Sequence, residues 1–394
     1  MQRRAARRDQ GCLTGSDGAR LRRILRAAHL DAHSETVRGP CPRAVGWSRE
    51  EGIVMGADQA APGNPMMEGT ELLAASRRFA SESRARSTWY VLSTFALLTG
   101  ACLIAATAPW WPVRVVASVT QGLLIVRAFI LAHDFQHGAI LRRSRWGKAL
   151  FTVFGLLVLT PARAWRQTHN YHHANTAKIV GAQIGSYPVM TVEMWRRASK
   201  GRRFAYAAVR HPLNILFGYL TIFLFGMCLS SFVRKPKENY DSLLALVLHV
   251  GLVVGLSWFF GFDVALLALV LPLFVACALG GYLFYAQHNF PDIHIQPRQT
   301  WNFQRAAVES SSYMRCGPVM SFFTGDIGLH HVHHLNAAIP FYRLREAMAA
   351  IPALQVPPAT SLHPRDIAAC LRLKLWDPVA EQMVPFPAEA TPSG

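Results

Sequence analysis

The chain has 394 residues, of which 51% are hydrophobic and only 16% are charged, whereas soluble globular chains carry roughly 25% charged residues. This composition argues against an ordinary soluble enzyme and indicates a membrane protein. The net charge is +18, and the basic residues lie beside apolar stretches rather than in a patch interleaved with aromatic residues. We therefore expect these basic residues to lie at the cytoplasmic face of a membrane, and we expect no nucleic-acid partner.

The N-terminal stretch differs from the rest of the chain. Residues 1–54 are rich in arginine, glycine and serine, and they lack both a sustained apolar period and the apolar core of a secretory signal peptide. We expect this stretch to be disordered and to be a non-native extension, followed by a cytoplasmic segment at residues 55–87. The native start is then expected at Met55, Met66 or Met67.

Four apolar segments are long enough to cross a bilayer, which takes about 20 residues in a helix. A short turn separates the first from the second and another separates the third from the fourth, so we expect two helical hairpins. Arg127 lies near the end of the second segment and is expected to snorkel toward the lipid headgroups. The spans are expected at residues 88–109, 113–132, 242–260 and 264–287.

Three histidine motifs lie at the ends of apolar segments, and their spacing repeats. The first is HxxxH after the second span, and the other two are both HxxHH. Spacings of three and four residues put the histidines of one motif on one helix face, with His331 pointing away from it. Three unrelated polar loops would not repeat this spacing. The eight histidines are His133, His137, His169, His172, His173, His330, His333 and His334.

The number of histidines indicates two metal ions. Eight imidazoles exceed what one ion can bind while keeping an open position, although ligand type alone leaves iron, copper, zinc and nickel open. A hydrolytic zinc pair would recruit carboxylates, and the only carboxylate in the motifs is Asp134, which we expect to orient an imidazole by a hydrogen bond to its outer nitrogen. Two irons with neutral imidazoles suit O2 activation, so we expect two Fe ions as cofactor and O2 as co-substrate.

Two further apolar stretches do not fit a simple span. Residues 149–160 are too short to cross, which indicates an interfacial or re-entrant segment. Residues 213–233 are long enough, but crossing would put the third motif on the opposite face from the first two, and basic residues flank both ends. We therefore expect an all-α integral membrane protein. It has four transmembrane helices in two hairpins, interfacial or re-entrant segments, and a cytoplasmic histidine-rich di-iron cap, with both termini cytoplasmic.

Aromatic and basic residues outside the motifs suggest contacts with lipid or a partner. Trp165, Trp195 and Trp301, with Tyr171 and Tyr187, are expected in an interfacial aromatic belt. The basic stretch at residues 196–210 suits anionic headgroups, an acidic electron carrier or simple solubility equally well.

The motifs HDFQH, HNYHH and HHVHH, interleaved with paired hydrophobic hairpins, resemble the histidine boxes of the membrane fatty-acid desaturases. Within that family, YAQHNF and GLHHVHHLNAAIPFYRL look most like delta-12 and omega-3 acyl desaturases. The resemblance implies a membrane desaturase domain at residues 88–345 and a cytoplasmic C-terminal segment at residues 346–394. It also implies His288 as a ninth iron ligand, just beyond the fourth span.

The resemblance further implies the reaction. An O2-dependent oxidoreductase of the delta-12 or omega-6 type would insert a double bond into a long acyl chain, carried as an acyl lipid or acyl thioester. Phe284 stands where the acyl-CoA desaturases have asparagine, which leaves the acyl carrier open. The chain has no phosphate loop, flavin element or fused cytochrome b5 motif. Electrons are therefore expected from a separate donor of the ferredoxin or cytochrome b5 type.

Two other functions remain alternatives. The same metal site could serve a hydroxylase or ketolase acting on an alkane, a carotenoid or an acyl lipid. A non-catalytic metal transporter would instead need histidines near the middle of the spans, and only His249 lies there. The motifs at the span ends therefore favour the oxidase.

Overall fold

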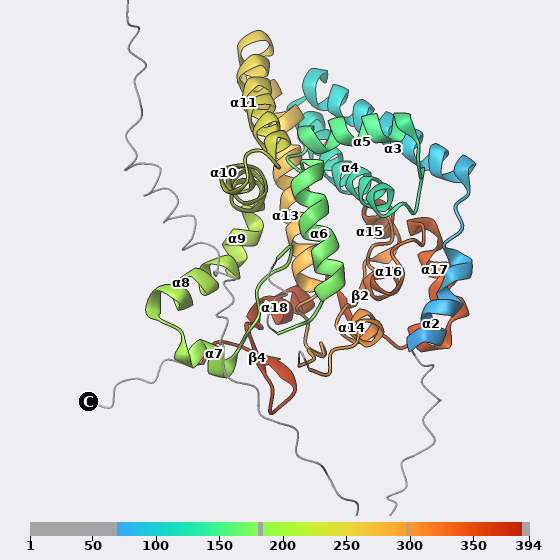
Figure 1. The fold of residues 1–394 in the computed structure, drawn as a ribbon. Helices are drawn as coiled ribbons and strands as arrows, with labels where there is room; N and C mark the ends of the chain where they lie inside the picture. Colours follow the sequence, from blue (N-terminus) through green and yellow to red (C-terminus); the bar gives the residue numbers. More distant parts are fainter. Residues whose placement is uncertain (1–68, 180–183, 298, 388–394) are drawn as a thin grey trace, which may run out of the picture. The chain divides into compact units, whose positions relative to one another are not determined.

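The computed structural model describes residues 69–179, 184–297 and 299–387, and these are mostly helical (Figure 1). The expectations for residues 1–54 and for the three start methionines concern residues outside these ranges. As expected, four helical runs in the described ranges are long and apolar enough to cross a membrane. They are α3 (Arg84–Thr107), α4 (Trp111–His137), α11 (Tyr240–Phe260) and a run over Phe262–Ala286 that joins α12 (Phe262–Ala265), the π-helical η3 (Leu266–Val270) and α13 (Leu271–Ala286).

The turns of the two hairpins are tied to each other. Gly261 follows α11 with a φ of 98°, a conformation that glycine adopts without strain. Oδ2 of Asp263, in the first turn of α12, lies 2.6 Å from Nη1 of Arg114 near the start of α4. Nε of Arg114 donates to the carbonyl of Ala105 in α3 at 2.9 Å. One arginine therefore links the ends of α3, α4 and α12.

The hairpins approach closely where α4 packs against α13 (Figure 1). Gly122 of α4 is buried, and a Cβ atom at this position would lie 2.8 Å from the backbone oxygen of Pro272 and 2.7 Å from Cβ of Val275. Small residues permit such close approach between membrane helices. The first and second hairpins therefore share one packed core.

The segment between the hairpins contains no straight span. The expected interfacial stretch 149–160 falls largely in α5 (Arg145–Leu157), which is bent by 95° from α6 (Ala162–Asn175). The stretch 213–233 forms α9 (Pro212–Leu216), then a short apolar helix made of η2 (Tyr219–Ser230) and α10 (Ser231–Arg234). The described helices fit four spans, or five if α5 and α6 are one broken span. The crossing pattern and the cytoplasmic orientation stay predictions.

Short elements complete the described chain. The expectation of an all-α fold is wrong in detail, because five strands of two or three residues occur, too short to leave an alternating sequence pattern. β1 (Met190–Thr191) pairs in parallel with β4 (Leu375–Asp377), and β4 pairs antiparallel with β5 (Gln382–Val384). β2 (Tyr313–Arg315) pairs in parallel with β3 (Ala359–Ser361). These pairings fold the segment after residue 345 back onto the earlier chain. The remaining helices are α2 (Gly69–Ser76), η1 (Arg77–Phe79), α7 (Val192–Arg197), α8 (Lys200–Val209), α14 (Phe303–Glu309), α15 (Gly317–Thr324), α16 (His330–Leu335), η4 (Phe341–Arg343), α17 (Leu344–Ala350), η5 (Pro352–Leu354) and α18 (Pro364–Arg372).

Arg127 does not snorkel, contrary to the expectation. Its side chain is 5% exposed, and its guanidinium lies 4.1 Å from the ring centroid of Phe322 on α15. Its Nε donates to Oγ1 of Thr94 on α3 at 3.1 Å, and Nη1 donates to the carbonyl of Phe322. The arginine is held inward because α15 packs on α4, a contact between distant parts of the chain.

A buried pair of cations fastens the C-terminal segment to the end of α13. Arg210 is fully buried and donates to the carbonyl of Pro188 at 2.7 Å and to Oδ1 of Asn289. Asn289 in turn donates to the carbonyl of Cys370 on α18 at 2.7 Å. Lys374, also buried, donates to the carbonyl of Arg210 at 2.7 Å. Burial, and then the charge of Arg210, lowers the pKa of Lys374 from 10.5 to about 8.

The close packing of α4 and α13 predicts that Gly122→Ala lowers stability. The added methyl group meets the Pro272 carbonyl, and overpacking of this kind costs about 1–3 kcal/mol. The measurement is the apparent thermal unfolding midpoint of the detergent-solubilised chain. Gly100→Ala on α3 is the matched control, because a Cβ there meets nothing within 4 Å. Equal midpoints for the two variants would contradict the close approach.

The lowered pKa of Lys374 predicts that the stability of the folded chain rises with pH between about pH 8 and pH 10.5. Its folded pKa of about 8 lies below its ordinary value of 10.5. Between these values the unfolded chain binds more protons, so stability increases as the pH rises through them. The unfolding midpoint of the wild type minus that of Lys374→Gln should therefore grow from pH 8 to pH 10.5. A difference that stays constant with pH would show that Lys374 keeps its ordinary pKa.

Candidate metal centre

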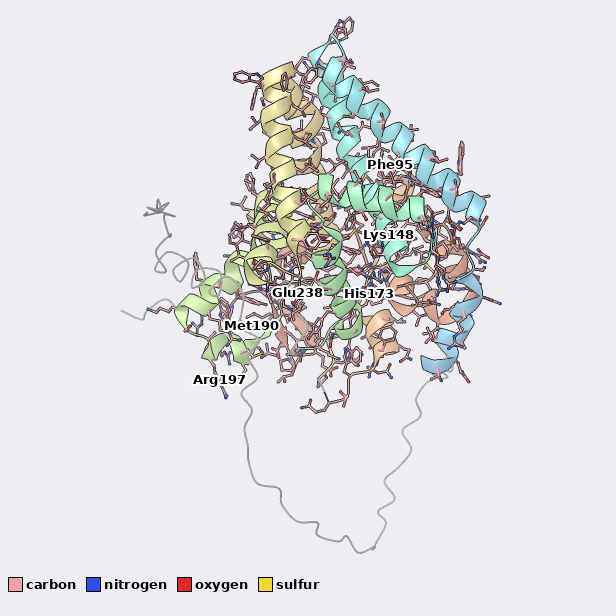
Figure 2. All side chains as sticks on the ribbon, turned by 45° about the horizontal axis from the view of Figure 1, so that its top comes forward. Phe95, Lys148, His173, Met190, Arg197 and Glu238 are labelled. Carbon is pink, nitrogen blue, oxygen red and sulfur yellow. The ribbon has the colours of Figure 1, made fainter. Side chains whose placement is uncertain are left out.

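Four parts of the chain bring nine histidines together. The first motif occupies the last turns of α4, which continues past the expected end at residue 132 and stops where Gly138 adopts the left-handed conformation. The second motif lies on α6, where Figure 2 labels His173. The third motif forms α16, and His288 follows the end of α13. All nine histidines expected as ligands belong to two groups in which one ring nitrogen from each residue lies within 4.8 Å of the others.

The first group contains five histidines, from α4, α6 and α16. Nε2 of His169 lies 3.0 Å from Nε2 of His137 and 3.0 Å from Nε2 of His173. Nε2 of His333 lies 3.2 Å from Nε2 of His173. The ring of His133 completes the group, with its centroid 4.5 Å from that of His333.

The second group contains four histidines: one from α6, two from α16, and His288, which lies two residues after the end of α13. Nε2 of His288 lies 3.0 Å from Nε2 of His172 and 3.0 Å from Nε2 of His330. Nε2 of His334 lies 3.1 Å from Nε2 of His330. The implied ninth ligand, His288, therefore lies within about 3 Å of two other members of this group.

Each of the two HxxHH motifs contributes histidines to both groups, but the two motifs do so in opposite ways. On α6 the i, i+4 pair belongs to the first group and His172 to the second, whereas on α16 the i, i+4 pair belongs to the second group and His333 to the first. Successive helix residues are about 100° apart, so position i+3 points to one side of i and position i+4 to the other. Because both helices serve both groups, the groups lie side by side. The rings of His173 and His334 stack across the boundary at 4.3 Å.

Hydrogen bonds to Nδ1 of His288 and Nδ1 of His334 leave the Nε2 atom of each ring with a lone pair that points into the second group. Nδ1 of His288 lies 3.1 Å from the carbonyl of Ser310, which only accepts, so Nδ1 carries the hydrogen and Nε2 carries the lone pair. The hydroxyl of Thr176 donates to the carbonyl of His172 at 2.8 Å and so accepts from Nδ1 of His334 at 3.3 Å. Nε2 of His288 and Nε2 of His334 therefore both present a lone pair to a group whose nitrogens lie within 4.8 Å of one another, and a cation among them would bind both lone pairs. The donor set therefore fits a nitrogen-preferring metal ion.

Burial keeps these imidazoles neutral. It lowers the pKa of His288 to about 4, against the opposing hydrogen bond to Ser310. It also lowers the pKa values of His330, His333 and His334 well below the usual range, and neighbouring histidines lower them further. Neutral imidazole is the form that binds metal. Near neutral pH these imidazoles are therefore unprotonated and able to bind metal cations.

Asp134 connects the first motif to the chain that follows the third. Its Oδ1 makes a long contact of 3.4 Å with Nδ1 of His133, and the orienting role stays a prediction. Its Oδ2 accepts a shorter bond of 2.7 Å from the backbone N–H of Phe341. The carboxylate therefore also holds the segment after α16 against α4, a role that the sequence does not reveal.

Several residues around the site were not expected there. Trp165, expected in the aromatic belt, stacks on the ring of His169 with centroids 4.4 Å apart. Phe284 packs against His172 at 4.9 Å. Trp165 precedes His169 by four residues, and Thr176 follows His172 by four, so helical periodicity carried a signal for both. The Ser310 carbonyl carried no sequence signal, because any residue has one.

Two buried histidines outside the site, His331 and His249, make other contacts. Nε2 of His331 lies 3.2 Å from the carbonyl of Leu354, so this side chain points away from its motif as expected. Nε2 of His249 lies 2.6 Å from the hydroxyl of Tyr219 in the apolar region. Neither residue belongs to either histidine group.

The chain is similar in sequence to known fatty acid desaturases. The profile of the family described as fatty acid desaturase matches residues 109–363, which contain all nine histidines. A fatty acid desaturase of Bacillus subtilis is 29% identical over 265 residues, covering 67% of this chain and 75% of the relative. An sn-1 acyl-lipid omega-3 desaturase (ferredoxin) of Synechocystis is 26% identical over 273 residues, covering 68% and 75%. An sn-1 oleoyl-lipid 12-desaturase of Picosynechococcus is 24% identical over 276 residues, covering 66% and 75%.

The family profile covers more than half of the chain, and the histidine motifs that carried the resemblance lie inside the matched region. Apolar helices long enough to cross a membrane accompany them. The chain is therefore an integral-membrane oxidoreductase that belongs to the fatty acid desaturase family.

Proposed function

We propose that the two histidine groups hold two iron ions and that the protein desaturates a long acyl chain. The observation that carries the proposal is the pair of adjacent groups, with five and four buried or half-buried imidazoles and no carboxylate in either. All-imidazole sites leave the metal pair positively charged, which suits O2 reduction better than hydrolysis. The nine histidines are proposed as both the metal ligands and the catalytic set, with Asp134 orienting His133.

The overall reaction balances with one acyl chain and one O2. A –CH2–CH2– unit, O2, two electrons and two protons become –CH=CH– and two waters. When bound, the iron pair supplies the ability to reduce O2 to an oxidant that removes hydrogen from an unactivated C–H bond. The chain's own residues hold the pair, keep their imidazoles neutral and exclude bulk water.

The proposed substrate is the acyl chain of a lipid, entering from the bilayer. Relatives described as acyl-lipid omega-3 and oleoyl-lipid 12-desaturases support this choice. Phe284 packs against the rings of His172 and His288, so an apolar wall adjoins the second group. Methylene groups need no polar partner there, and each contributes about 0.8 kcal/mol on burial. Within this class we propose delta-12, or omega-6, regiochemistry.

The proposed arrangement in the cell puts the histidines and both termini on the cytoplasmic side. Basic residues flank the segment between the hairpins, which supports that orientation. A relative whose name specifies ferredoxin supports a separate electron donor of the ferredoxin or cytochrome b5 type.

Two separate groups predict that single substitutions remove one ion at a time. His137→Ala in the first group, or His288→Ala in the second, should lower the iron content from about two ions per chain to about one. Elemental analysis of the purified chain gives the count. His331→Gln is the control on the same helix as the third motif, since His331 belongs to neither group. Complete iron loss in every variant, the control included, would argue against two discrete sites.

Desaturation predicts a specific product in the lipids of an expressing host. Gas chromatography with mass spectrometry should find a new double bond with the wild type and with His331→Gln. His172→Ala should make none while remaining in the membrane fraction. A new oxygenated product without a double bond would replace the desaturase with the alternative hydroxylase or ketolase. Unchanged activity of His172→Ala would remove the iron site from the mechanism.

A further inference from the structure

We propose that the surface around Trp301 and Lys178 is the docking site of an acidic one-electron donor protein, and that Trp301 and Thr176 connect it to His334. The inference rests on the proposed iron site and names the place where its reductant enters. In each encounter the donor would lose one electron, and the iron that the histidines would hold would gain it. Two encounters supply the two electrons that the reaction consumes.

A short bonded path leads from this surface to the second histidine group. The indole Nε1–H of Trp301 donates to the carbonyl of Thr176 at 2.8 Å. The hydroxyl of the same threonine lies 3.3 Å from Nδ1 of His334, a member of the second group. Electron tunnelling falls off less steeply along covalent and hydrogen bonds than through space. This chain of contacts is therefore a suitable route.

The outer end of the path carries a fixed positive charge. Nζ of Lys178 lies 3.9 Å from the ring centroid of Trp301 and donates to Oδ1 of Asn175 at 3.0 Å. Within the described ranges, no ion pair with a carboxylate is found for this lysine. The indole is half-buried, and Gln299, Thr300 and Asn302 beside it are exposed. The Trp301 ring and the positive charge of Lys178 together suit contact with a protein whose surface is acidic.

Trp165 also touches a ligand ring but is a poorer entry point. It stacks on His169 and packs edge-on against Phe129 of α4, a helix long and apolar enough to cross the membrane. It therefore adjoins the spans, where a soluble donor has no access. Trp301 lies in the segment between α13 and α14, outside every candidate span.

Trp301→Phe tests the path, because phenylalanine keeps a ring but removes the N–H that bonds Thr176. Iron-loaded full-length protein is mixed anaerobically with reduced [2Fe–2S] ferredoxin in a stopped-flow instrument, and the ferredoxin absorbance reports its oxidation. The saturating rate should fall several-fold while the Kd stays unchanged. Trp195→Phe is the matched control, since Trp195 also lies beside a cation, Arg203, but packs on Phe386 instead of bonding toward a ligand. Equal rates for Trp301→Phe and wild type would overturn the path.

Lys178→Glu tests the docking surface without altering the indole. Charge reversal should raise the ferredoxin Kd about tenfold, which corresponds to ~1.4 kcal/mol, and should weaken the salt dependence of association. Arg202→Glu on the basic stretch of α8 is the control, because Arg202 is exposed and far along the chain from Trp301. Weaker binding with Arg202→Glu but not with Lys178→Glu would overturn the docking site and assign it to α8.

Iron content and direct reduction separate this inference from the proposed function. All variants should keep wild-type iron content, and dithionite should reduce them at the wild-type rate. If the wild type binds no iron, the proposed function fails, whereas the effect of Lys178→Glu on ferredoxin binding still decides the docking site. Loss of iron in Trp301→Phe would show that Trp301 maintains the ligand set and would overturn its assignment to electron transfer.

Discussion

The structure depends on holding nine imidazole nitrogens together in an interior that largely excludes water. A buried polar atom without a partner costs about 1–3 kcal/mol, and the Nδ1 atoms of His330 and His333 have no partner within the described ranges. The lone pairs of His288 and His334 point into one group and add to this cost, which a bound cation would offset. Metal binding would therefore be coupled to folding around the histidines, and the rest of the fold must supply rigidity.

That rigidity comes from the packed hairpins. α4 ends in histidines of the first group, and α13 is followed by His288 of the second, so the contact at Gly122 helps to set the separation of the two groups. α6 and α16 each contribute to both groups, which prevents either group from moving alone. A shift of any one of these helices would therefore disturb both candidate metal positions.

The C-terminal segment supports the site although, in its described part, it adds no residue to either histidine group. Asn289, the residue after His288, bonds Arg210 and the carbonyl of Cys370, so α18 and the end of α13 are held together. Asp134 makes a comparable link from α4 to Phe341. Histidines of the two groups at the ends of helices, where the backbone would otherwise fray, are in this way fixed by distant parts of the chain.

The sequence by itself determined the membrane class, the four apolar helices, the histidine motifs and the family resemblance, because hydropathy and helical spacing are local properties. Helical spacing predicted that the histidines of each motif lie close together, but only the tertiary structure decided how the two HxxHH motifs divide between two groups. The inward position of Arg127, the stacking of Trp165 on His169 and the bond from Asp134 to Phe341 likewise depend on residues far away in the chain. Local periodicity fixes the direction in which a side chain leaves its own helix. It does not say which distant element lies there to receive it.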